Sequence, residues 1–329
     1  MTKASRTAPF PHVIPALAVI TALLAVASLM IGPTGIGLGG SPEARWLILT
    51  EIRLPRTLLG VLIGGALGLS GAALQGYLRN PLAEPGVIGI SGGAGLGAVL
   101  AIHSGFAGAL AIGLPLGGLA GAASAMAIVL WLAGERGGPI TLILSGVAVA
   151  SLTTALIALV LTLSQNPFAA VEIVFWLMGS LTDRSMTHVW LAGPPILLGM
   201  TLLLRLGRDL DALTLGEEVA ANLGTSLVRL RILIVAGTAL SVGAATAVSG
   251  TIGFVGLVVP HILRPLVGHS PSRLLPASAL GGAALVLAAD LALRLVSPGG
   301  GIRLGVVTAL IGTPFFVWLV LSTRRELAP

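Results

Sequence analysis

Long apolar runs, separated by short polar connections, constrain this chain more than any other feature of its sequence. A helix that crosses a membrane needs about 20 mostly apolar residues. Ten runs approach or exceed that length, at residues 13–32, 54–76, 87–103, 109–132, 140–164, 189–206, 229–250, 251–268, 274–296 and 303–322. The touching runs near residue 250 and the short third run leave nine or eleven spans open. We predict an all-α integral membrane protein with about ten transmembrane helices, folded as one transmembrane domain over residues 1–329.

The scarcity of certain side chains excludes several kinds of chemistry. The chain has no cysteine, so disulfides and thiolate sites are excluded. Lys3 is its only lysine, so the interior Gly-Lys-Ser/Thr of an ATPase phosphate-binding loop is absent. The net charge of +6 comes from arginines scattered between apolar runs, which is typical of loop and interface anchors rather than nucleic-acid binding. We predict no catalytic residues, no metal site and no cofactor.

The first apolar run has two interpretations. Lys3 and Arg6 precede it, and the small tripeptide at residues 25–27 would suit cleavage of a secretory signal. Because the apolar character continues to Ile31, we favour a retained helix.

Basic residues in the loops predict the orientation, because Lys and Arg resist translocation. With ten spans and a cytoplasmic N-terminus, the inner side receives Lys3, Arg6, Arg79, Arg136, Arg205, Arg208, Arg229, Arg231, Arg264, Arg273, Arg324 and Arg325. The outer side receives fewer, namely Arg45, Arg53, Arg56, Arg184, Arg294 and Arg303. We therefore predict both termini in the cytoplasm, and the outer arginines need a separate explanation.

Three glycine-rich segments suggest two functions, dinucleotide binding and intramembrane proteolysis, that we weigh against helix packing. Residues 35–40 and 92–97 imitate dinucleotide loops, but neither segment opens a βαβ unit. Ser91 lies in a Gly-x-Ser-Gly sequence like that of an intramembrane protease, which would need His103 or His261 as its partner. We favour packing for all of these segments. A further ladder of small residues predicts a smooth stripe on the second helix, at Gly60, Gly64, Gly68 and Ala72.

Few ionisable residues fall at mid-membrane depth, whereas proton-coupled carriers usually place carboxylates or histidines on their transport pathway. We therefore expect the energy for transport to come from a soluble partner, with an ion-coupled carrier working alone as the alternative. The longest cytoplasmic connection, residues 205–230, is the expected point of entry. Its segment 215–224 predicts a short amphipathic helix that docks on the partner. A helix lying on the lipid surface is disfavoured, because the polar face here is acidic.

Several motifs carry a resemblance to one family over nearly the whole chain. They read Arg53-Leu-Pro-Arg56, Gly68-Leu-Ser-Gly71-Ala-Ala-Leu-Gln75, Arg79-Asn80-Pro81-Leu-Ala-Glu-Pro85-Gly86, Ile88-Gly-Ile-Ser91-Gly-Gly-Ala94, Phe175-Trp-Leu-Met-Gly179-Ser-Leu, Leu215-Gly-Glu, Ile252-Gly-Phe-Val-Gly-Leu-Val-Val-Pro260-His261-Ile-Leu-Arg264 and Gly305-Val-Val-Thr-Ala-Leu-Ile-Gly312-Thr-Pro314. The chain resembles the FecCD-type permeases, the membrane subunits of ABC importers for iron-siderophores, heme and cobalamin.

The resemblance implies a type II ABC importer permease in the bacterial inner membrane. Such a permease pairs with a second copy of itself, binds two ATP-binding cassette subunits inside and receives cargo from a periplasmic binding protein outside. The chain would then be a permease rather than an enzyme, in contact with membrane lipid and not with nucleic acid. Cargo would pass along the subunit interface, past the runs 140–164, 251–268 and 303–322.

The resemblance also assigns roles to particular residues. It implies docking of the binding protein at Arg53, Arg56 and Arg294, which would explain outer arginines that the orientation left unexplained. It implies a cytoplasmic gate at Asn80. The coupling contacts with the ATPase would be Leu215, Gly216, Glu217, Glu218, Leu223 and Gly224.

Departures from the family pattern limit what is carried over. Relatives commonly read Glu-Leu-Pro-Ile-Gly where this chain has Gly301-Ile-Arg303-Leu-Gly305, so Arg303 is either a docking contact or an anchor for the helix end. We assign no gate role to Pro139 or Ile140.

The cargo is predicted from a single loop. The Pro85-Gly86 sequence is closer to heme and cobalamin permeases than to siderophore permeases, so heme is favoured and the other two stay open. We interpret His103, His188 and His269 as loop histidines rather than heme ligands.

Overall fold

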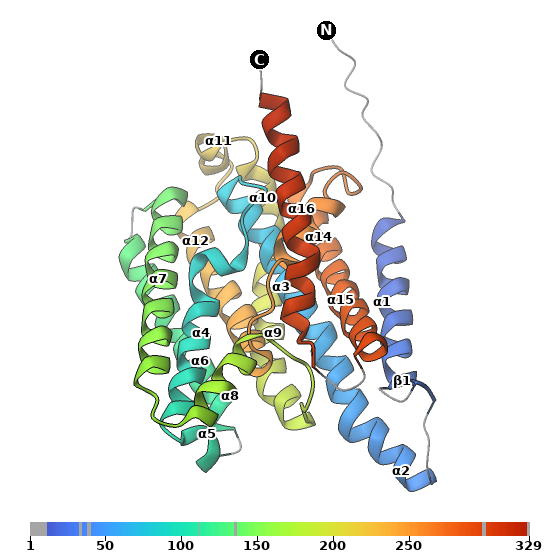
Figure 1. The fold of residues 1–329 in the computed structure, drawn as a ribbon. Helices are drawn as coiled ribbons and strands as arrows, with labels where there is room; N and C mark the ends of the chain where they lie inside the picture. Colours follow the sequence, from blue (N-terminus) through green and yellow to red (C-terminus); the bar gives the residue numbers. More distant parts are fainter. Residues whose placement is uncertain are drawn as a thin grey trace.

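The computed structural model describes residues 12–32, 35–37, 41–110, 112–134, 137–297 and 301–327 (Figure 1). Lys3, Arg6 and Arg136, which contribute to the predicted orientation, lie outside the described residues, as do the side chains of Arg324 and Arg325. The longer helices are α1 (Val13–Met30), α3 (Leu54–Leu78), α4 (Ile90–His103), α6 (Gly113–Ala133), α7 (Pro139–Leu163), α8 (Pro167–Leu177), α9 (Met186–Arg205), α12 (Leu227–Thr238), α15 (Pro271–Val296) and α16 (Leu304–Leu327). Shorter elements connect or extend them, namely β1 (Ile31–Gly32), β2 (Gly35–Ile36), α2 (Pro42–Leu47), η1 (Ile48–Arg53), η2 (Pro85–Ile88), α5 (Phe106–Ala109), α10 (Gly207–Leu213), α11 (Glu217–Asn222), η3 (Ala239–Gly243), α13 (Ala244–Ser249) and α14 (Val255–Leu263).

Each of the ten predicted runs contains a helix. Within the described residues, seven helices are long and apolar enough to cross a membrane, and α4, α8 and the segment Leu304–Leu319 of α16 are shorter apolar helices. The runs that touch near residue 250 are separate elements, because the chain leaves the helix at Gly250, which has φ +72°, and re-enters it at Val255. The prediction of an all-helical membrane protein is confirmed.

The structure differs from the prediction at three places. A continuous helical segment begins at Pro42, capped by the Ser41 side chain, and runs 37 residues to Leu78, whereas the predicted run starts at residue 54. β1 and β2 form a small antiparallel hairpin after α1. The short helix α8 follows α7, where the amide N–H of Phe168 donates to the Asn166 side chain at 3.0 Å. Local capping signals, rather than long apolar runs, start the two unexpected helical segments.

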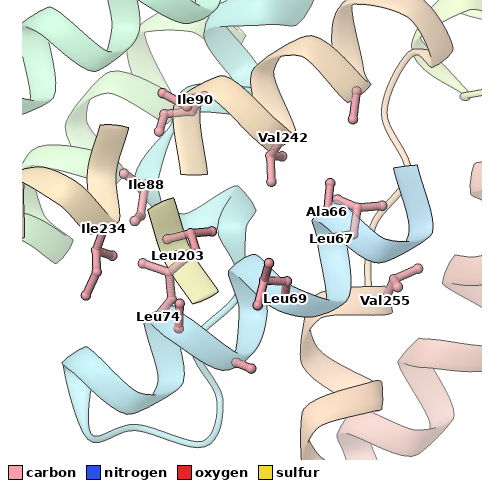
Figure 2. Packing of buried hydrophobic residues seen from close by; sticks show 14 of the residues in the cluster. Ala66, Leu67, Leu69, Leu74, Ile88, Ile90, Leu203, Ile234, Val242 and Val255 are labelled. Carbon is pink, nitrogen blue, oxygen red and sulfur yellow. The ribbon is translucent and has the colours of Figure 1, made fainter. Parts of the chain in front are cut away.

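The helix α3 lies at the centre of the molecule and packs against α15, α9 and α14. Its predicted glycine stripe is confirmed as a contact surface, because a Cβ at Gly64 or Gly68 would collide with the backbone of α15 at Gly282 or Ser278. Close backbone approach replaces the hydrophobic driving force that helices lack in lipid. Figure 2 shows buried side chains around α3, among them Leu69.

Different short elements lie at the two ends of the molecule. In Figure 1, α10, α11 and the last turns of α16 lie at one end, and α2, β1 and α5 lie at the other. We refer to these as the α11 end and the α2 end. Between them the outer faces are apolar, with Trp131 78% and Trp190 72% exposed. Such exposure is expected of side chains that face lipid.

Candidate functional site

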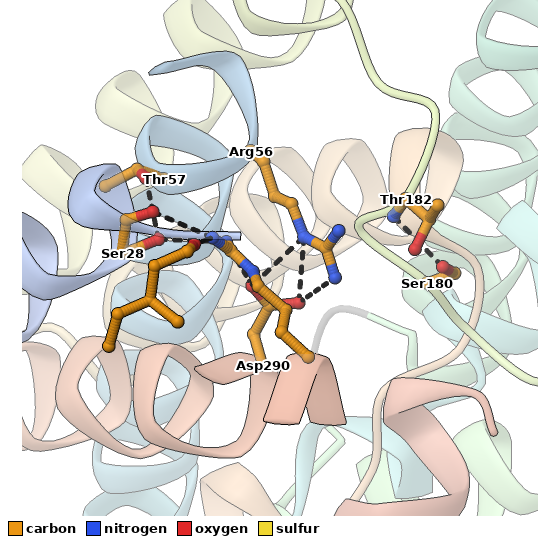
Figure 3. Close-up of polar contacts among 8 residues, drawn as sticks. Ser28, Arg56, Thr57, Ser180, Thr182 and Asp290 are labelled. Atoms are coloured by element: carbon orange, nitrogen blue, oxygen red, sulfur yellow. Dashed lines mark hydrogen bonds and ion pairs between the residues drawn. The ribbon is translucent and has the colours of Figure 1, made fainter. Parts of the chain in front are cut away.

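A buried network of charged side chains joins α1, α3 and α15 at the α2 end (Figure 3). The Arg56 Nε donates to both carboxylate oxygens of Asp290 at 3.1 Å, and its Nη2 donates to Oδ1 at 2.7 Å. Arg294 donates to Oδ2 of the same carboxylate at 3.0 and 2.6 Å. Ser28 extends the network, because its hydroxyl accepts from Arg294 at 2.9 Å and lies 2.7 Å from the Thr57 hydroxyl. Asp290 therefore holds two arginines in place.

Two arginines also cap the end of α1. Arg294 Nη1 donates to the carbonyls of Ser28 and Ile31 at 2.7 and 2.9 Å. Arg53 Nη1 donates to the carbonyl of Leu29 at 2.8 Å. The last carbonyls of a helix have no partners within the helix, and cations are favourable there. These arginines therefore stabilise the last turn of α1.

The structure brings together the three arginines predicted to dock the binding protein. Arg53 and Arg294 are only 6% and 5% exposed, whereas the Arg56 side chain is 15% exposed. A cavity of about 70 Å³ extends from Arg56 past Thr182. Contact with a partner stays a prediction, and Arg56 is best placed for it. The sequence analysis assigned no role to Asp290, although its i,i+4 spacing from Arg294 indicated a pair on one helix.

The loop after α3 contains the predicted gate residue. Arg79 ends the helix in the left-handed conformation, with φ +49°. The Asn80 side-chain oxygen then accepts from the amide N–H of Leu82 at 2.9 Å, which closes an Asx turn. Asn80 itself is exposed at the α11 end. Its role as a gate stays a prediction.

The same loop is fastened to α14. Glu84 Oε1 accepts from the amide N–H of Phe254 at 2.5 Å, so this carboxylate caps the first turn of α14. Burial raises the pKa of Glu84, and the hydrogen bond from Phe254 opposes that shift. Gln75 joins the same region, because its Nε2 donates to the carbonyl of Gly256 at 3.2 Å and its Oε1 accepts from Arg264 at 2.5 Å. Any movement of α14 is therefore transmitted to the loop.

The predicted coupling segment contains the short helix α11. Gly216 and Gly224 flank it with φ +107° and +91°, a backbone region that favours glycine. Leu215 and Leu223 are 64% and 65% exposed, whereas Ala220 is fully buried. The predicted helix over 215–224 is thus shorter than expected, and Leu215 lies in the turn before it. The exposed leucines are an apolar surface at the α11 end.

An ion pair links this segment to the loop after α3, which contains Asn80. Arg79 Nη2 lies 3.0 Å from Glu217 Oε1, with both side chains nearly half exposed. An exposed pair of this kind contributes at most about 1 kcal/mol. It is therefore a contact that can break and re-form, rather than a fixed brace.

An apolar groove of about 520 Å³ lies between α8 and α16. Its walls include Leu177, Met178, Gly305, Val306, Leu310 and Pro314. The run 303–322 is one of those expected to border the cargo pathway. The groove is thus the largest apolar hollow beside that predicted route among the cavities described.

The structure does not support a serine protease. Ser91 lies at the start of α4 and His103 at its end, which separates them by roughly 18 Å along the helix. The His261 ring instead packs edge-on against Phe315, with centroids 5.5 Å apart. Among the described residues, Ser91 makes no hydrogen bond to a histidine, and no group of three or more acidic, His or Cys side chains could hold a metal ion.

Comparisons with known proteins agree with the geometry. Residues 15–322 match the FecCD transport family. The chain is 41% identical over 283 residues to the uncharacterized ABC transporter permease protein YvrB of Bacillus subtilis, covering 84% of this chain and 80% of YvrB. It is 40% identical over 281 residues to the cobalamin import permease BtuC of Halobacterium salinarum, with coverage of 85% and 75%. It is 37% identical over 297 residues to the hemin transport permease HmuU of Yersinia pestis, covering 86% of each.

A solved structure shows the same fold. It is described as a metal-chelate type ABC transporter in an inward-facing conformation, and it superposes with a TM-score of 0.87 at 34% identity. The match covers 95% of this chain and 100% of that one. The predicted type II importer architecture is confirmed, and the relatives confirm that the chain is a permease subunit rather than an enzyme. The chain belongs to the FecCD transport family.

Proposed function

We propose that this chain is the membrane subunit of an ATP-driven importer that carries a bulky metal chelate from the periplasm to the cytoplasm. The match to the FecCD transport family over residues 15–322 carries this proposal. The walls of the apolar groove support it, because among the described residues they include no carboxylate or histidine, and a carrier that used a proton gradient would need such titratable groups there. The energy for transport then comes from ATP-hydrolysing subunits bound at one end.

The proposed assembly contains two copies of this chain, two ATP-binding cassette subunits and one periplasmic binding protein. The α11 end faces the cytoplasm, with both chain termini on that side of the bacterial inner membrane. Leu215, Gly216, Glu217, Glu218, Leu223 and Gly224 contact the ATPase, and Asn80 contributes to the gate. The exposure of Leu215 and Leu223 supports this placement, since apolar patches of this kind mark partner contacts.

At the α2 end, the cluster of Arg53, Arg56 and Arg294 docks the binding protein. The Arg56 side chain retains partial exposure beside the cavity toward Thr182, so it makes the direct contact. The more deeply buried Arg53 and Arg294 hold the surface in shape. Arginine suits such docking because its planar fork fixes the direction of a carboxylate pair.

Heme is the favoured cargo, with cobalamin and iron-siderophores as the other members of the same class. The relative named for hemin transport and the apolar walls of the groove support this choice. A planar apolar chelate would gain dispersion contacts with such walls without being held by specific ligands.

Uptake into proteoliposomes tests the function. The permease is reconstituted with its ATPase subunits, ATP is trapped at the ATPase face, and a protonophore removes any proton gradient. Heme delivered by the binding protein should accumulate, and a hydrolysis-deficient ATPase should abolish accumulation. Uptake that requires the gradient and persists without ATP would instead establish the ion-coupled carrier.

A further inference from the structure

Two arginines outside the docking cluster lie in the chain segments that border the apolar groove. Arg303 immediately precedes α16, and its guanidinium carbon lies 5.2 Å from the centre of the Phe175 ring of α8. Arg184 lies in the loop between α8 and α9. The start of α16 is joined to that loop, because the amide N–H of Gly305 donates to the carbonyl of Gly179 at 3.4 Å. The fold therefore holds the start of α16, next to Arg303, against the loop that contains Arg184.

Neither arginine forms a salt bridge within 4 Å among the described residues, although the neighbouring Asp183 acts on Arg184 as an opposite charge. The Nε atoms of Arg184 and Arg303 are both buried, and neither has a hydrogen-bond partner there. Each guanidinium carries five N–H donors. Leaving a buried donor unpaired is unfavourable, and more so when the group is charged. The fold thus keeps donors available that an anion would satisfy.

The charges around Arg184 and Arg303 also favour the binding of an anion. Burial lowers the pKa of Arg184, the Asp183 charge opposes that shift, and the charge of Arg303 lowers the pKa further. Arg303 therefore acts on Arg184 as a like charge, while Asp183 acts on it more strongly as an opposite charge. Asp183 and Glu172 are exposed, and neither forms a salt bridge with these arginines. A bound anion would relieve the repulsion.

The docking cluster provides a direct contrast within the same molecule. There, Asp290 accepts hydrogen bonds from both Arg56 and Arg294. At the groove rim the fold supplies two arginines without such a carboxylate. This difference indicates that the missing anion belongs to a ligand.

The position of the pair selects the kind of ligand. Gly305 and Val306 line the groove only two and three residues after Arg303, and Met178 lines it from the other side. A ligand that reaches both features needs an apolar body in the groove and an anionic group at the rim. Carboxylate fits best, because guanidinium binds it through two parallel hydrogen bonds.

We propose that Arg184 and Arg303 form an anion-recognition site at the mouth of the groove, where they bind the carboxylate substituents of an apolar metal chelate. The propionates of a metalloporphyrin have this chemistry. This inference rests on the proposed import function and specifies its substrate class. The pair selects carboxylate-bearing chelates over neutral ones, because a site built for charged hydrogen bonds rejects an analogue that cannot make them.

A binding experiment isolates this selection. The permease–ATPase complex in lipid nanodiscs is titrated with iron protoporphyrin IX and with its dimethyl ester, following the Soret absorbance, without the binding protein. The wild-type complex should bind the diacid at least about tenfold more tightly than the ester. Arg184→Gln and Arg303→Gln should each reduce that ratio, and the double variant should bring it close to one. Arg303→Lys should retain part of it, since lysine keeps the charge but loses the fork.

Controls separate this site from other roles. Arg45→Gln changes an exposed arginine of α2 and should leave the ratio unchanged. Equal wild-type affinity for diacid and ester would overturn the inference, as would variants that weaken both probes alike. Loss of binding-protein association in Arg303→Gln with an unchanged probe ratio would assign Arg303 to docking instead. The proposed function fails on a different result, namely no ATP-dependent uptake of any metal chelate by the complete wild-type importer.

Discussion

Asp290 shows how one buried carboxylate organises its surroundings. It is 1% exposed and accepts hydrogen bonds from Arg56 and Arg294, which come from different helices. A buried ion pair is weak evidence for stability, but removal of one partner leaves uncompensated charge behind. Here the removal of one carboxylate would leave two cations, so the consequence should be large.

Replacement of this carboxylate tests its structural role. Asp290→Asn should lower the free energy of unfolding by about 3 kcal/mol, because both arginines lose their counter-charge. Thermal unfolding in detergent measures the change. Glu51→Gln alters an exposed acid of η1 and should have little effect. Equal stability of the two variants would contradict the central role of Asp290.

Arg56 offers a separate test of docking. Arg56→Gln should weaken association with the binding protein and reduce the salt dependence of that association, because one fewer charge pair forms. The glutamine avoids placing a second acid beside Asp290, as a charge reversal would. Association measured over a salt series gives the result, and an unchanged slope would remove Arg56 from the docking surface.

The helices show how far sequence patterns predict this fold. Apolar runs locate a helix in each of the ten expected segments, because hydropathy is a direct requirement of the membrane, although α14 in the run 251–268 has only nine residues. The apolar runs do not indicate the hairpin of β1 and β2 or the helix α8. These elements depend on local hydrogen bonds, which only a few residues determine. The start of the long helix at Pro42 is missed for the same reason, since its first turns are amphipathic rather than apolar. Hydropathy therefore predicts the membrane spans more reliably than it predicts the elements that connect them.

The stripe on α3 gives a prediction about helix packing. Gly64→Val places a side chain against the backbone of α15 at Gly282, which cannot yield as a flexible side chain would. We expect a loss of about 3 kcal/mol in stability, at the upper end for overpacked sites. Gly108→Ala is a matched control, because nothing lies within 4 Å of the added Cβ. Unfolding of both variants in detergent would distinguish them, and equal stability would refute the close contact.

The cap on α14 predicts a dependence on pH. Burial raises the folded-state pKa of Glu84, so the fold favours its protonated form relative to the unfolded chain. The contribution of this group to stability is therefore greatest below its unfolded pKa and is lost as pH rises through the higher folded value. Glu84→Gln removes this titration. Wild-type stability should fall relative to that variant between acidic and neutral pH, and a constant difference would contradict the assignment.

At the scale of the whole molecule, the sequence predicts which residues come together at a site better than it predicts the hydrogen bonds that those residues make. The resemblance directs attention to Arg53, Arg56 and Arg294, and the fold does gather them. Their inward hydrogen bonds could not be read from the sequence, because these bonds depend on the crossing of α1, α3 and α15. The rim pair of Arg184 and Arg303 was likewise hidden, since 118 intervening residues separate its members along the chain.

Coupling to the ATPase is tested at the exposed face near α11. Leu223→Asp should leave ATP hydrolysis by the complex present while lowering uptake by about tenfold or more, because a buried contact of this size contributes about 1.5–3 kcal/mol. Uptake and phosphate release, measured in the same sample, give the amount of cargo transported per ATP hydrolysed. The control is a leucine of α1, Leu23, which is as exposed as Leu223. Because an aspartate at Leu23 would disturb the lipid face, the two leucines are compared as Leu23→Ala and Leu223→Ala. Normal coupling in both Leu223 variants would exclude this docking surface.

The helical segment from Pro42 to Leu78 has a mechanical consequence. At 37 residues it measures roughly 55 Å, whereas the hydrocarbon layer is about 30 Å thick. One helical segment therefore reaches from the α2 end, the proposed periplasmic side, to the turn that begins at Arg79. We expect a tilt applied to its outer tip to swing the inner tip the opposite way, as a see-saw does. Spin labels at the exposed positions Glu43 and Arg79 should keep a constant separation if this segment is a stiff rod, and a separation that changes would show that the rod bends at η1 instead.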